Sequence, residues 1–328
     1  MIKTAVYGYR EDEERFFSHY SEKLGVELVR VKENADLGNV SFSEGCVQVT
    51  VLSDMVITRS MLEAYKKNGV KLLTTRTIGA DHIDLEAASD CGIAVSRITY
   101  SPYSVADYTI MLILMVMRHV KTILTRYYGQ DYTIPGSMGK ELPGKTVGLI
   151  GGGQIGKALA RHLSGFDCRI LISDHHPSDE LKGIAEYCDQ ETLIRESDII
   201  SLHVPYTEAN HHMINADTIA SMKDGVIIIN TARGGLIDSG ALIDALESGK
   251  VGGAGLDLVE GDREIYYRDH KDKPFAFREK AILDAFPNVV MMPHMAFYTD
   301  QVVEDMVRYT LEAAVSFSEG KEIPYRLV

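Results

Sequence analysis

The sequence predicts an α/β protein built from two doubly wound parallel-sheet domains. Strand-like and helix-like segments alternate from residue 3 onward, and the alternation becomes regular after residue 146. Such alternation places covering helices on a parallel sheet. A glycine-rich turn at residues 151–156 joins one strand to the next helix. The chain has 328 residues, more than one hydrophobic core usually holds, so two domains are expected.

The first hundred residues form one alternating unit. Strands are expected at residues 3–9, 26–31 and 70–79, and helices at residues 11–25 and 61–69. A change follows at Pro102, which disfavours helical geometry at the residue before it. Ser104 is expected to cap an apolar helix over residues 105–119. A hinge between domains is therefore expected near residue 102.

The rest of the chain predicts a complete dinucleotide-type sheet. Strands are expected at residues 146–150, 168–173, 198–204, 225–230, 251–257 and 288–293. Helices are expected at residues 157–166, 191–197, 215–223 and 240–249. A last helix, residues 300–320, has no strand after it to join this sheet. We expect it to return and cover the first domain.

Composition narrows the class of partner. The net charge of −13 argues against nucleic acid and anionic membranes, because binding to phosphates needs a basic face. The apolar run at residues 108–117 is about half of the ~20 residues that span a bilayer. The early acids argue against a signal peptide, and the four cysteines lack zinc-type spacing. A cytoplasmic protein without a metal is expected.

The glycine turn has the features of a phosphate cradle. Gly151, Gly153 and Gly156 follow a strand and open a helix, where glycines let the backbone approach a pyrophosphate at the helix N-terminus. Asp174 closes the next strand, 18 residues after Gly156. A carboxylate there accepts hydrogen bonds from ribose hydroxyls and repels a 2′-phosphate. These residues predict a site for NAD rather than NADP.

Three strand ends supply candidate catalytic groups. Arg233 follows one strand and can grip a carboxylate with its planar fork, while His294 follows another and suits proton transfer. A third strand ends in several acids, namely Asp257, Glu260, Asp262 and Glu264. Other histidines, including the adjacent pairs 175–176 and 211–212, are expected to be structural, because sequence neighbours seldom face one metal.

Seven segments together resemble the D-isomer-specific 2-hydroxyacid dehydrogenase family, and most closely its D-lactate dehydrogenase branch, which includes the dehydrogenases of glycopeptide-resistance operons. The segments are TRTIGADHIDLEAA, YSPYSVADYT, VGLIGGGQIGKA, SLHVPYTEANHHMI, KDGVIIINTARGGLID, GLDLVEGD and NVVMMPHMAFYT. The resemblance implies a Rossmann NAD-binding domain, residues 102–298, inserted in a flavodoxin-like substrate domain made of residues 1–101 and 299–328.

The resemblance also implies roles for individual residues. Arg233 would bind the substrate carboxylate and polarise its keto group, and His294 would exchange a proton with the keto oxygen. The positions expected to contact NAD are Gln154, Ile155, Asp174, Val204, Pro205, Asn210, Thr231, Ala232, Arg233 and Asp257. Those expected to contact the substrate are Ile78, Gly79, Tyr100, Phe297 and Tyr298.

Two residues depart from the family pattern. Asp262 stands where the family has the third catalytic residue, a Glu, so its side chain is one methylene shorter. An acid there stabilises the protonated histidine, and Glu260 or Glu264 could take its place. Met295 replaces a residue that is usually small, and its thioether could reshape the pocket.

The expected function is NAD-dependent reduction of a short 2-keto acid, pyruvate first, to the D-2-hydroxy acid. One alternative is the same chemistry on larger branched or aromatic keto acids. An alternative of another class is an NADH-sensing regulatory protein, which the retained Arg233 and His294 disfavour. By analogy with the family, the apolar helix over residues 105–119 suggests a homodimer.

Overall fold

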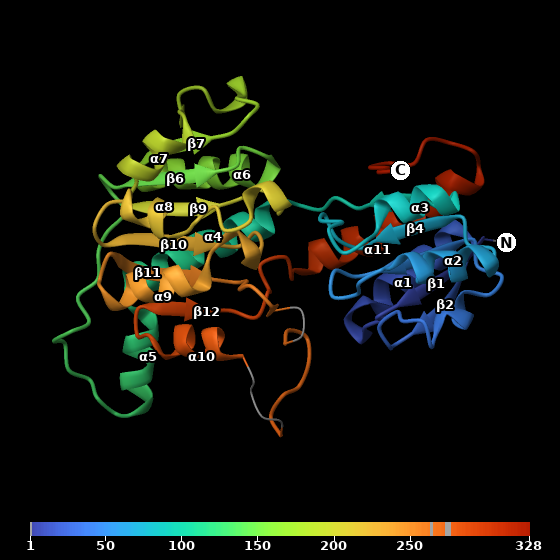
Figure 1. Cartoon of the computed structure of the whole chain (residues 1–328), viewed down its shortest axis with the longest axis horizontal. Helices are drawn as coiled ribbons and strands as arrows, with labels where there is room; N and C mark the ends of the chain where they lie inside the picture. The colour runs from blue at the N-terminus through green and yellow to red at the C-terminus, as the bar shows by residue number, and fades with distance from the viewer. Residues whose placement is uncertain (1, 263–264, 273–276) are drawn as a thin grey trace. The chain divides into compact units, whose positions relative to one another are not determined.

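The structure is a computed structural model that describes residues 2–262, 265–272 and 277–328 (Figure 1). The chain forms two compact units, Met1–Ser101 with Tyr298–Val328, and Pro102–Phe297. Tyr298, which the expected boundary groups with the central domain, belongs to the first unit. The Tyr298 ring lies against Arg10 of that unit, with its centre 5.8 Å from the guanidinium.

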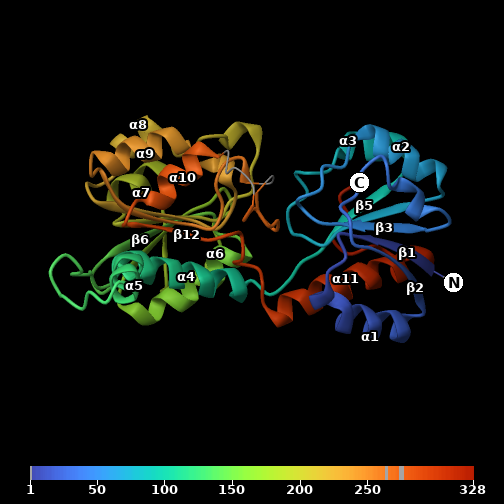
Figure 2. The same ribbon diagram turned by 90° about the horizontal axis from the view of Figure 1, so that it is seen from below.

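The first unit is a five-stranded parallel sheet in the order β2-β1-β3-β4-β5, the flavodoxin-like order. Its strands are β1 (Ile2–Tyr7), β2 (Val26–Val31), β3 (Gln48–Val51), β4 (Leu72–Thr75) and β5 (Ala94–Arg97). Helices α1 (Glu14–Leu24) and α11 (Asp300–Ser318) cover one face, and α2 (Arg59–Lys67) and α3 (Leu85–Cys91) the other (Figure 2). The last helix thus covers the N-terminal sheet, as expected.

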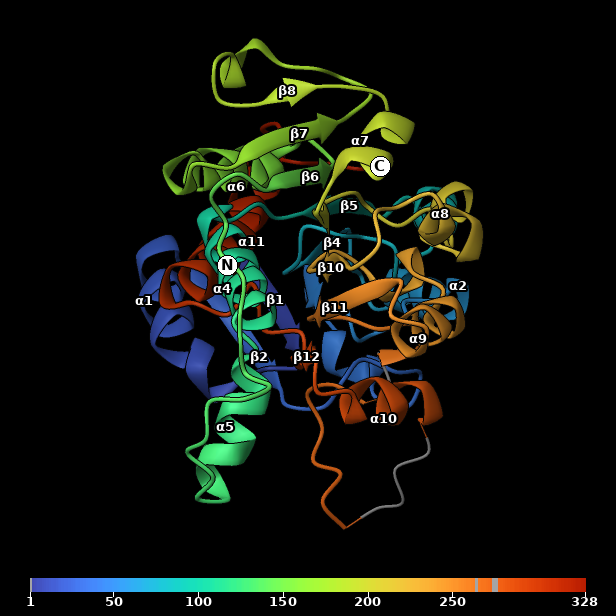
Figure 3. The same ribbon diagram turned by 90° about the vertical axis from the view of Figure 1, so that its left-hand side faces the viewer.

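The second unit is a seven-stranded parallel sheet in the order β12-β11-β10-β9-β6-β7-β8 (Figure 3). Its strands are β6 (Thr146–Ile150), β7 (Arg169–Ser173), β8 (Glu186–Tyr187), β9 (Ile199–Leu202), β10 (Val226–Asn230), β11 (Val251–Leu256) and β12 (Val289–Met291). The order reverses beside β6, as in dinucleotide-binding sheets. The predicted fold class, two doubly wound parallel sheets, is confirmed.

Helices cover both faces of this second sheet (Figure 2). One face carries α4 (Tyr103–Met117), α5 (Val120–Tyr128) and α6 (Gln154–Leu163). The other carries α7 (Gln190–Glu196), α8 (Ala216–Ala220), α9 (Ser239–Glu247) and α10 (Arg278–Ala285). Two aliphatic clusters, one on each face, form the core of the unit.

The apolar helix α4 differs from expectation at both ends. Its N-cap is Pro102, so Ser104 lies inside the first turn, and its hydroxyl donates to the carbonyl of Ala296 at 2.6 Å instead of capping the helix. The helix ends at Met117, because His119 takes a left-handed backbone conformation with φ 50°. Helix α4 therefore ties the β12 loop to the sheet.

Within the described part of the chain, no helix by itself has the length and apolar character to cross a membrane. Helices α4 and α5 meet those criteria only when joined, on length and composition alone, and they bend by 67° at the break between them.

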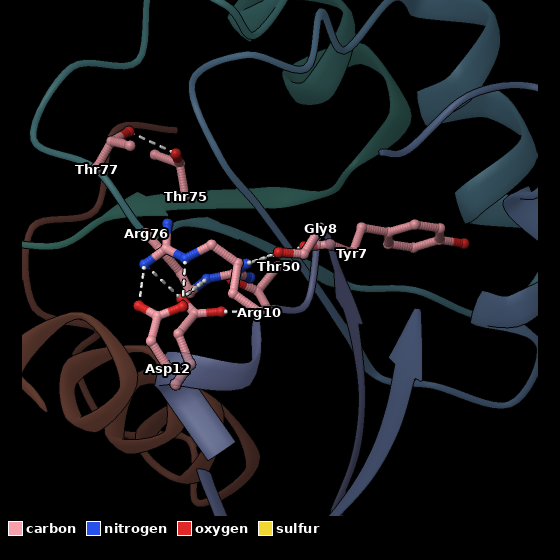
Figure 4. A network of polar contacts seen from close by, with 9 residues as sticks. Tyr7, Gly8, Arg10, Asp12, Thr50, Thr75, Arg76 and Thr77 are labelled. Atoms are coloured by element: carbon pink, nitrogen blue, oxygen red, sulfur yellow. Dashed lines mark hydrogen bonds and ion pairs between the residues drawn. The ribbon is translucent and has the colours of Figure 1, made fainter. Parts of the chain in front are cut away.

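A buried ion pair holds the end of β4 in the first unit (Figure 4). Arg76 Nε lies 3.1 Å from Glu13 Oε1, and both side chains are fully buried. A second guanidinium nitrogen of Arg76 donates to the carbonyl of Tyr7 at 2.9 Å. Because Arg76 directly precedes residues 77–79, this network sets where that loop begins.

We predict that Glu13→Ala lowers the free energy of unfolding by about 3–5 kcal/mol, because it leaves the Arg76 charge buried without its carboxylate. Asp12→Ala is the matched control: Asp12 pairs with Arg10 at 3.1 Å, but both side chains are partly exposed, so about 1 kcal/mol or less is expected. Urea unfolding measures both. Equal effects of the two substitutions would contradict a dominant role for the buried pair.

Candidate functional site

Three neighbouring strands of the second unit, β10, β11 and β12, carry the candidate catalytic groups just after their carboxyl-terminal ends, along the same end of the sheet. In the parallel register Asn230 pairs with Leu256, and Leu256 with Met291. Arg233 follows the first of these strand ends by three residues, and His294 follows the last by three. Adjacent strands lie ~4.8 Å apart, so the two segments leave the sheet about 10 Å apart, with the end of β11 between them.

Asp257, which directly follows β11, forms several hydrogen bonds at this end of the sheet. Its backbone carbonyl accepts the N–H of His294 at 2.9 Å. Its fully buried carboxylate accepts the N–H groups of Met295 and Ala296, each at 2.9 Å. Burial raises the pKa of the Asp257 carboxyl, and these hydrogen bonds oppose the rise. Asp257, expected as a cofactor contact, thus holds the loop that carries His294.

His294 has a left-handed backbone with φ 56°. Such a conformation costs about 1–3 kcal/mol in a non-glycine residue and persists where the surroundings enforce it. Here the N–H donates to Asp257, and the carbonyl accepts the Tyr267 hydroxyl at 2.8 Å. The centres of the Tyr267 and Phe297 rings lie 5.7 Å and 6.1 Å from that of the imidazole. The imidazole of His294 therefore lies beside two aromatic rings, and hydrogen bonds hold its backbone on both sides.

Asn230 shapes the turn that carries Arg233. Its buried amide accepts the N–H of Ala232 at 3.0 Å and donates to the carbonyl of Arg233 at 2.8 Å. The half-buried guanidinium of Arg233 donates to the Ala232 carbonyl at 2.7 Å. Asn230 was not among the predicted site residues. Its signal in the sequence is one polar residue that closes the aliphatic run VIIIN.

The candidate acids after β11 separate in the structure. The Asp262 carboxylate accepts the N–H of Val259 at 3.2 Å within its own turn. The Glu260 carboxylate lies 2.8 Å from Nε2 of His212 instead, which argues against Glu260 as the acid that would partner His294. Glu264 lies outside the described residues.

The glycine turn fits a dinucleotide. A Cβ at Gly151 would lie 2.5 Å from the His203 carbonyl oxygen, and one at Gly156 would lie 2.1 Å from the Gly151 carbonyl oxygen, so close packing requires both glycines. A Cβ at Gly153 would meet nothing within 4 Å, and its φ of −68° suits any residue. Packing in the chain thus gives no reason for this third glycine, whereas a pyrophosphate approaching the backbone does.

The neighbouring groups support the same fit. No side chain caps the start of α6 among the described residues, so its first N–H groups can receive phosphate oxygens. The Asp174 carboxylate accepts the N–H groups of Gly152 at 2.6 Å and His176 at 2.7 Å. These bonds orient it beside the turn, where it would accept ribose hydroxyls. Gln154 and Ile155 open α6 directly after the turn.

The other predicted cofactor positions follow β9 and β10. Asn210 donates to the Pro205 carbonyl at 2.8 Å and braces the loop that also holds Val204. Thr231 lies 3.0 Å from Thr109, hydroxyl to hydroxyl, and Ala232 follows it. Burial lowers the pKa of His203, beside the same loop, to about 4. That histidine is therefore neutral near pH 7.

The first unit carries the remaining predicted substrate contacts. The carbonyls of Ile78 and Gly79 accept from Arg97 at 3.3 Å and from the Thr77 hydroxyl at 2.6 Å. Among the described residues their N–H groups have no acceptor, which leaves both donors for a ligand. Tyr100 lies half-buried after β5. Burial and the Asp12 carboxylate raise the pKa of the Tyr298 hydroxyl.

Comparisons with known proteins agree with this geometry. Residues 110–296 match the family model of the D-isomer specific 2-hydroxyacid dehydrogenase, NAD binding domain. The chain is 40% identical to a D-specific alpha-keto acid dehydrogenase of Enterococcus faecium over 98% of both chains. It is 38% identical to an aromatic 2-oxoacid reductase of Clostridium sporogenes over 94% of both. The crystal structure of a D-lactate dehydrogenase from Treponema pallidum superposes with a TM-score of 0.89, at 32% identity over the whole of both chains.

We predict that Gly153→Asp weakens NADH binding at least about 100-fold, because the new carboxylate caps α6 and repels the pyrophosphate. The fold should be unaffected, since the added atoms enter open space. Gly165→Asp is the matched control, because Gly165 is exposed and its Cβ would also meet nothing within 4 Å. Titration of NADH fluorescence gives the affinities, and thermal unfolding checks the fold. Unchanged affinity in Gly153→Asp would refute the cradle.

Proposed function

The chain belongs to the D-isomer specific 2-hydroxyacid dehydrogenase family and is an NAD-dependent oxidoreductase; from this premise we propose that it reduces a short 2-keto acid, pyruvate first, to the D-2-hydroxy acid. The observation that carries the proposal is that Arg233 and His294 leave one sheet edge on either side of Asp257. The regulatory alternative has no support from these relatives, which are named as dehydrogenases and reductases.

Arg233 would bind and polarise the keto acid. Its planar guanidinium can donate paired hydrogen bonds to a carboxylate and to the keto oxygen. The buried Asn230 amide holds the backbone on which the guanidinium stands. The N–H groups of Ile78 and Gly79, with the Tyr100 hydroxyl, would bind the carboxylate. Phe297 and Tyr298 would contact the substrate side chain.

His294 would donate the proton that the keto oxygen takes up, and would accept it back in the oxidation. The bound NADH supplies the hydride to the keto carbon. A carboxylate beside a protonated imidazole stabilises the charged form, and Asp262 would serve in this way. The Asp262 side chain is shorter than that of the Glu usual in the family. Its contact with His294 would therefore depend on where the backbone after β11 lies.

Reduction of larger keto acids is the second candidate. It is favoured by the 38% identity to an aromatic 2-oxoacid reductase and by the aromatic rings of Tyr267 and Phe297 beside His294. Met295 is half-buried in the same loop and would narrow the space for a large side chain. Steady-state rates with pyruvate, a branched keto acid and phenylpyruvate, each with NADH and NADPH, decide between the two. A higher kcat/KM for phenylpyruvate than for pyruvate would overturn the short-substrate proposal.

A cytoplasmic homodimer also belongs to this proposal. The apolar α4 is largely buried in its own unit, but α5 after it exposes Ile123, Leu124, Tyr127 and Tyr128. An apolar face of this kind suits a second copy of the chain. Light scattering on the purified chain gives the mass; a monomer at micromolar concentration would refute the dimer.

We predict that Arg233→Ala lowers kcat/KM for pyruvate by about 1,000-fold or more, because two charge-assisted hydrogen bonds are lost. Arg233→Lys keeps the charge without the fork and should recover only part of the loss. Stopped-flow or steady-state oxidation of NADH measures both variants. Wild-type kinetics with pyruvate in Arg233→Ala would eliminate this role.

We predict that Asp262→Asn moves the pH at which pyruvate reduction falls by half to a lower value. The carboxylate favours the protonated imidazole, so without it His294 loses its proton at lower pH. Asp262→Glu should restore the profile. Asp269→Asn, an exposed acid on the same segment, is the control and should leave the profile in place. If the Asp262→Asn enzyme kept the wild-type profile, Asp262 would not be coupled to His294.

A further inference from the structure

We propose that His211, His212 and Glu260 form a binding site for a divalent transition-metal ion, with Zn²⁺ as the best match. The three residues come from two loops of the second unit, one after β9 and one after β11. Their ligand atoms, one imidazole nitrogen from each histidine and one carboxylate oxygen, all lie within 4.8 Å of one another. The site is separate from the groups proposed for the reduction.

The ligand atoms already lie close together. His212 Nε2 lies 2.8 Å from one oxygen of Glu260, and His211 Nε2 lies 3.9 Å from the other. The two imidazole rings stack with centres 3.7 Å apart and planes 25° apart. Both Nε2 atoms lie beside the Glu260 carboxylate, and the stacked rings must tilt for their Nε2 lone pairs to converge on one ion. Zn²⁺ binds such ligand atoms at ~2.0–2.2 Å, so His211 would move toward Glu260 and His212 slightly away from it to admit the ion.

The backbone explains how sequence neighbours come to share a ligand. His212 is left-handed, with φ 51°, which turns its side chain alongside that of His211. Its N–H donates to the Gly235 carbonyl at 2.9 Å and holds this turn in place. The sequence predicts no metal at residues 211–212 because adjacent side chains normally diverge. Strained backbone conformations of non-glycine residues occur most often at functional sites.

The second nitrogen of each imidazole faces an oxygen. Nδ1 of His211 lies 3.2 Å from the Tyr206 hydroxyl, and Nδ1 of His212 lies 3.9 Å from a carboxylate oxygen of Asp238. Asp238 uses its other oxygen to cap α9. Metal-binding histidines are oriented by such partners on the opposite nitrogen. In this arrangement Nε2 of both rings lies on the Glu260 side, where the ion would bind in place of the direct His212–Glu260 contact.

The chemistry of the ligands selects the ion. Imidazoles with one carboxylate suit Zn²⁺, Co²⁺, Ni²⁺ or Cu²⁺, whereas Mg²⁺ and Ca²⁺ prefer oxygen ligands alone. Three protein ligands leave a coordination position for water or an anion. A bound ion would join the loop after β9 to the loop after β11, on which Asp262 lies two residues beyond Glu260. The ion should therefore stabilise this edge of the unit against heat.

The test is metal binding to the full chain stripped with chelator and kept free of NADH. Equilibrium dialysis against Zn²⁺ should give one saturable site, and visible absorption of Co²⁺ should report nitrogen and oxygen ligands. Glu260→Gln keeps a hydrogen bond to His212 but removes the charge, and should weaken Zn²⁺ binding at least about 10-fold. His212→Asn should do the same. Tyr206→Phe should weaken it less, because it removes only an orienting group.

The matched control is the double variant His175→Asn/His176→Asn, which removes the other adjacent histidine pair, exposed beyond β7. It should bind Zn²⁺ as the wild type does. Three results would overturn the proposal: no saturable Zn²⁺ binding, equal affinity in wild type and Glu260→Gln, or a thiolate band in the Co²⁺ spectrum that assigns the ion to cysteine. Because no readout uses turnover, failure here is independent of the proposed reduction.

Discussion

The positions of the residues proposed for catalysis depend on one interaction, the hydrogen bonds that the Asp257 carboxylate accepts. This carboxylate is fully buried between the end of β11 and the β12 loop, and it accepts two consecutive backbone N–H groups, from Met295 and Ala296. Leaving such donors unpaired in the interior costs free energy. The loop therefore has one favourable position, in which His294 has a left-handed backbone.

The same constraint reaches the neighbouring strand and the covering helix. Ser104 on α4 donates to the carbonyl of Ala296, so the apolar helix holds the loop from the other side. Asn230 plays the matching part at the end of β10 by bonding to both sides of the Arg233 turn. The Arg233 and His294 side chains thus stand on separate turns, and each turn is held by its own hydrogen bonds. The roles proposed for the two side chains need such fixed positions.

Much of this architecture follows from sequence pattern, because apolar strands, glycines and strand-end polar residues are local signals. The sequence alone predicted the strand ends that carry Arg233 and His294, and also the turn at residues 151–156. Bonds between distant segments could not be predicted. Ser104 stands at a position typical of a helix cap, but its hydroxyl donates to the distant carbonyl of Ala296. The pairing of Glu260 with His212 depends on the left-handed backbone of His212, which no local sequence pattern indicates.

The most direct measurement is a crystal structure of the chain with NADH and oxamate, an unreactive isostere of pyruvate. The account predicts that the Arg233 guanidinium and the His294 imidazole lie within hydrogen-bonding distance of the same oxamate molecule, with the bonds from Asp257 to Met295 and Ala296 intact. Oxamate bound to only one of the two side chains, or His294 turned away on a rearranged loop, would contradict it.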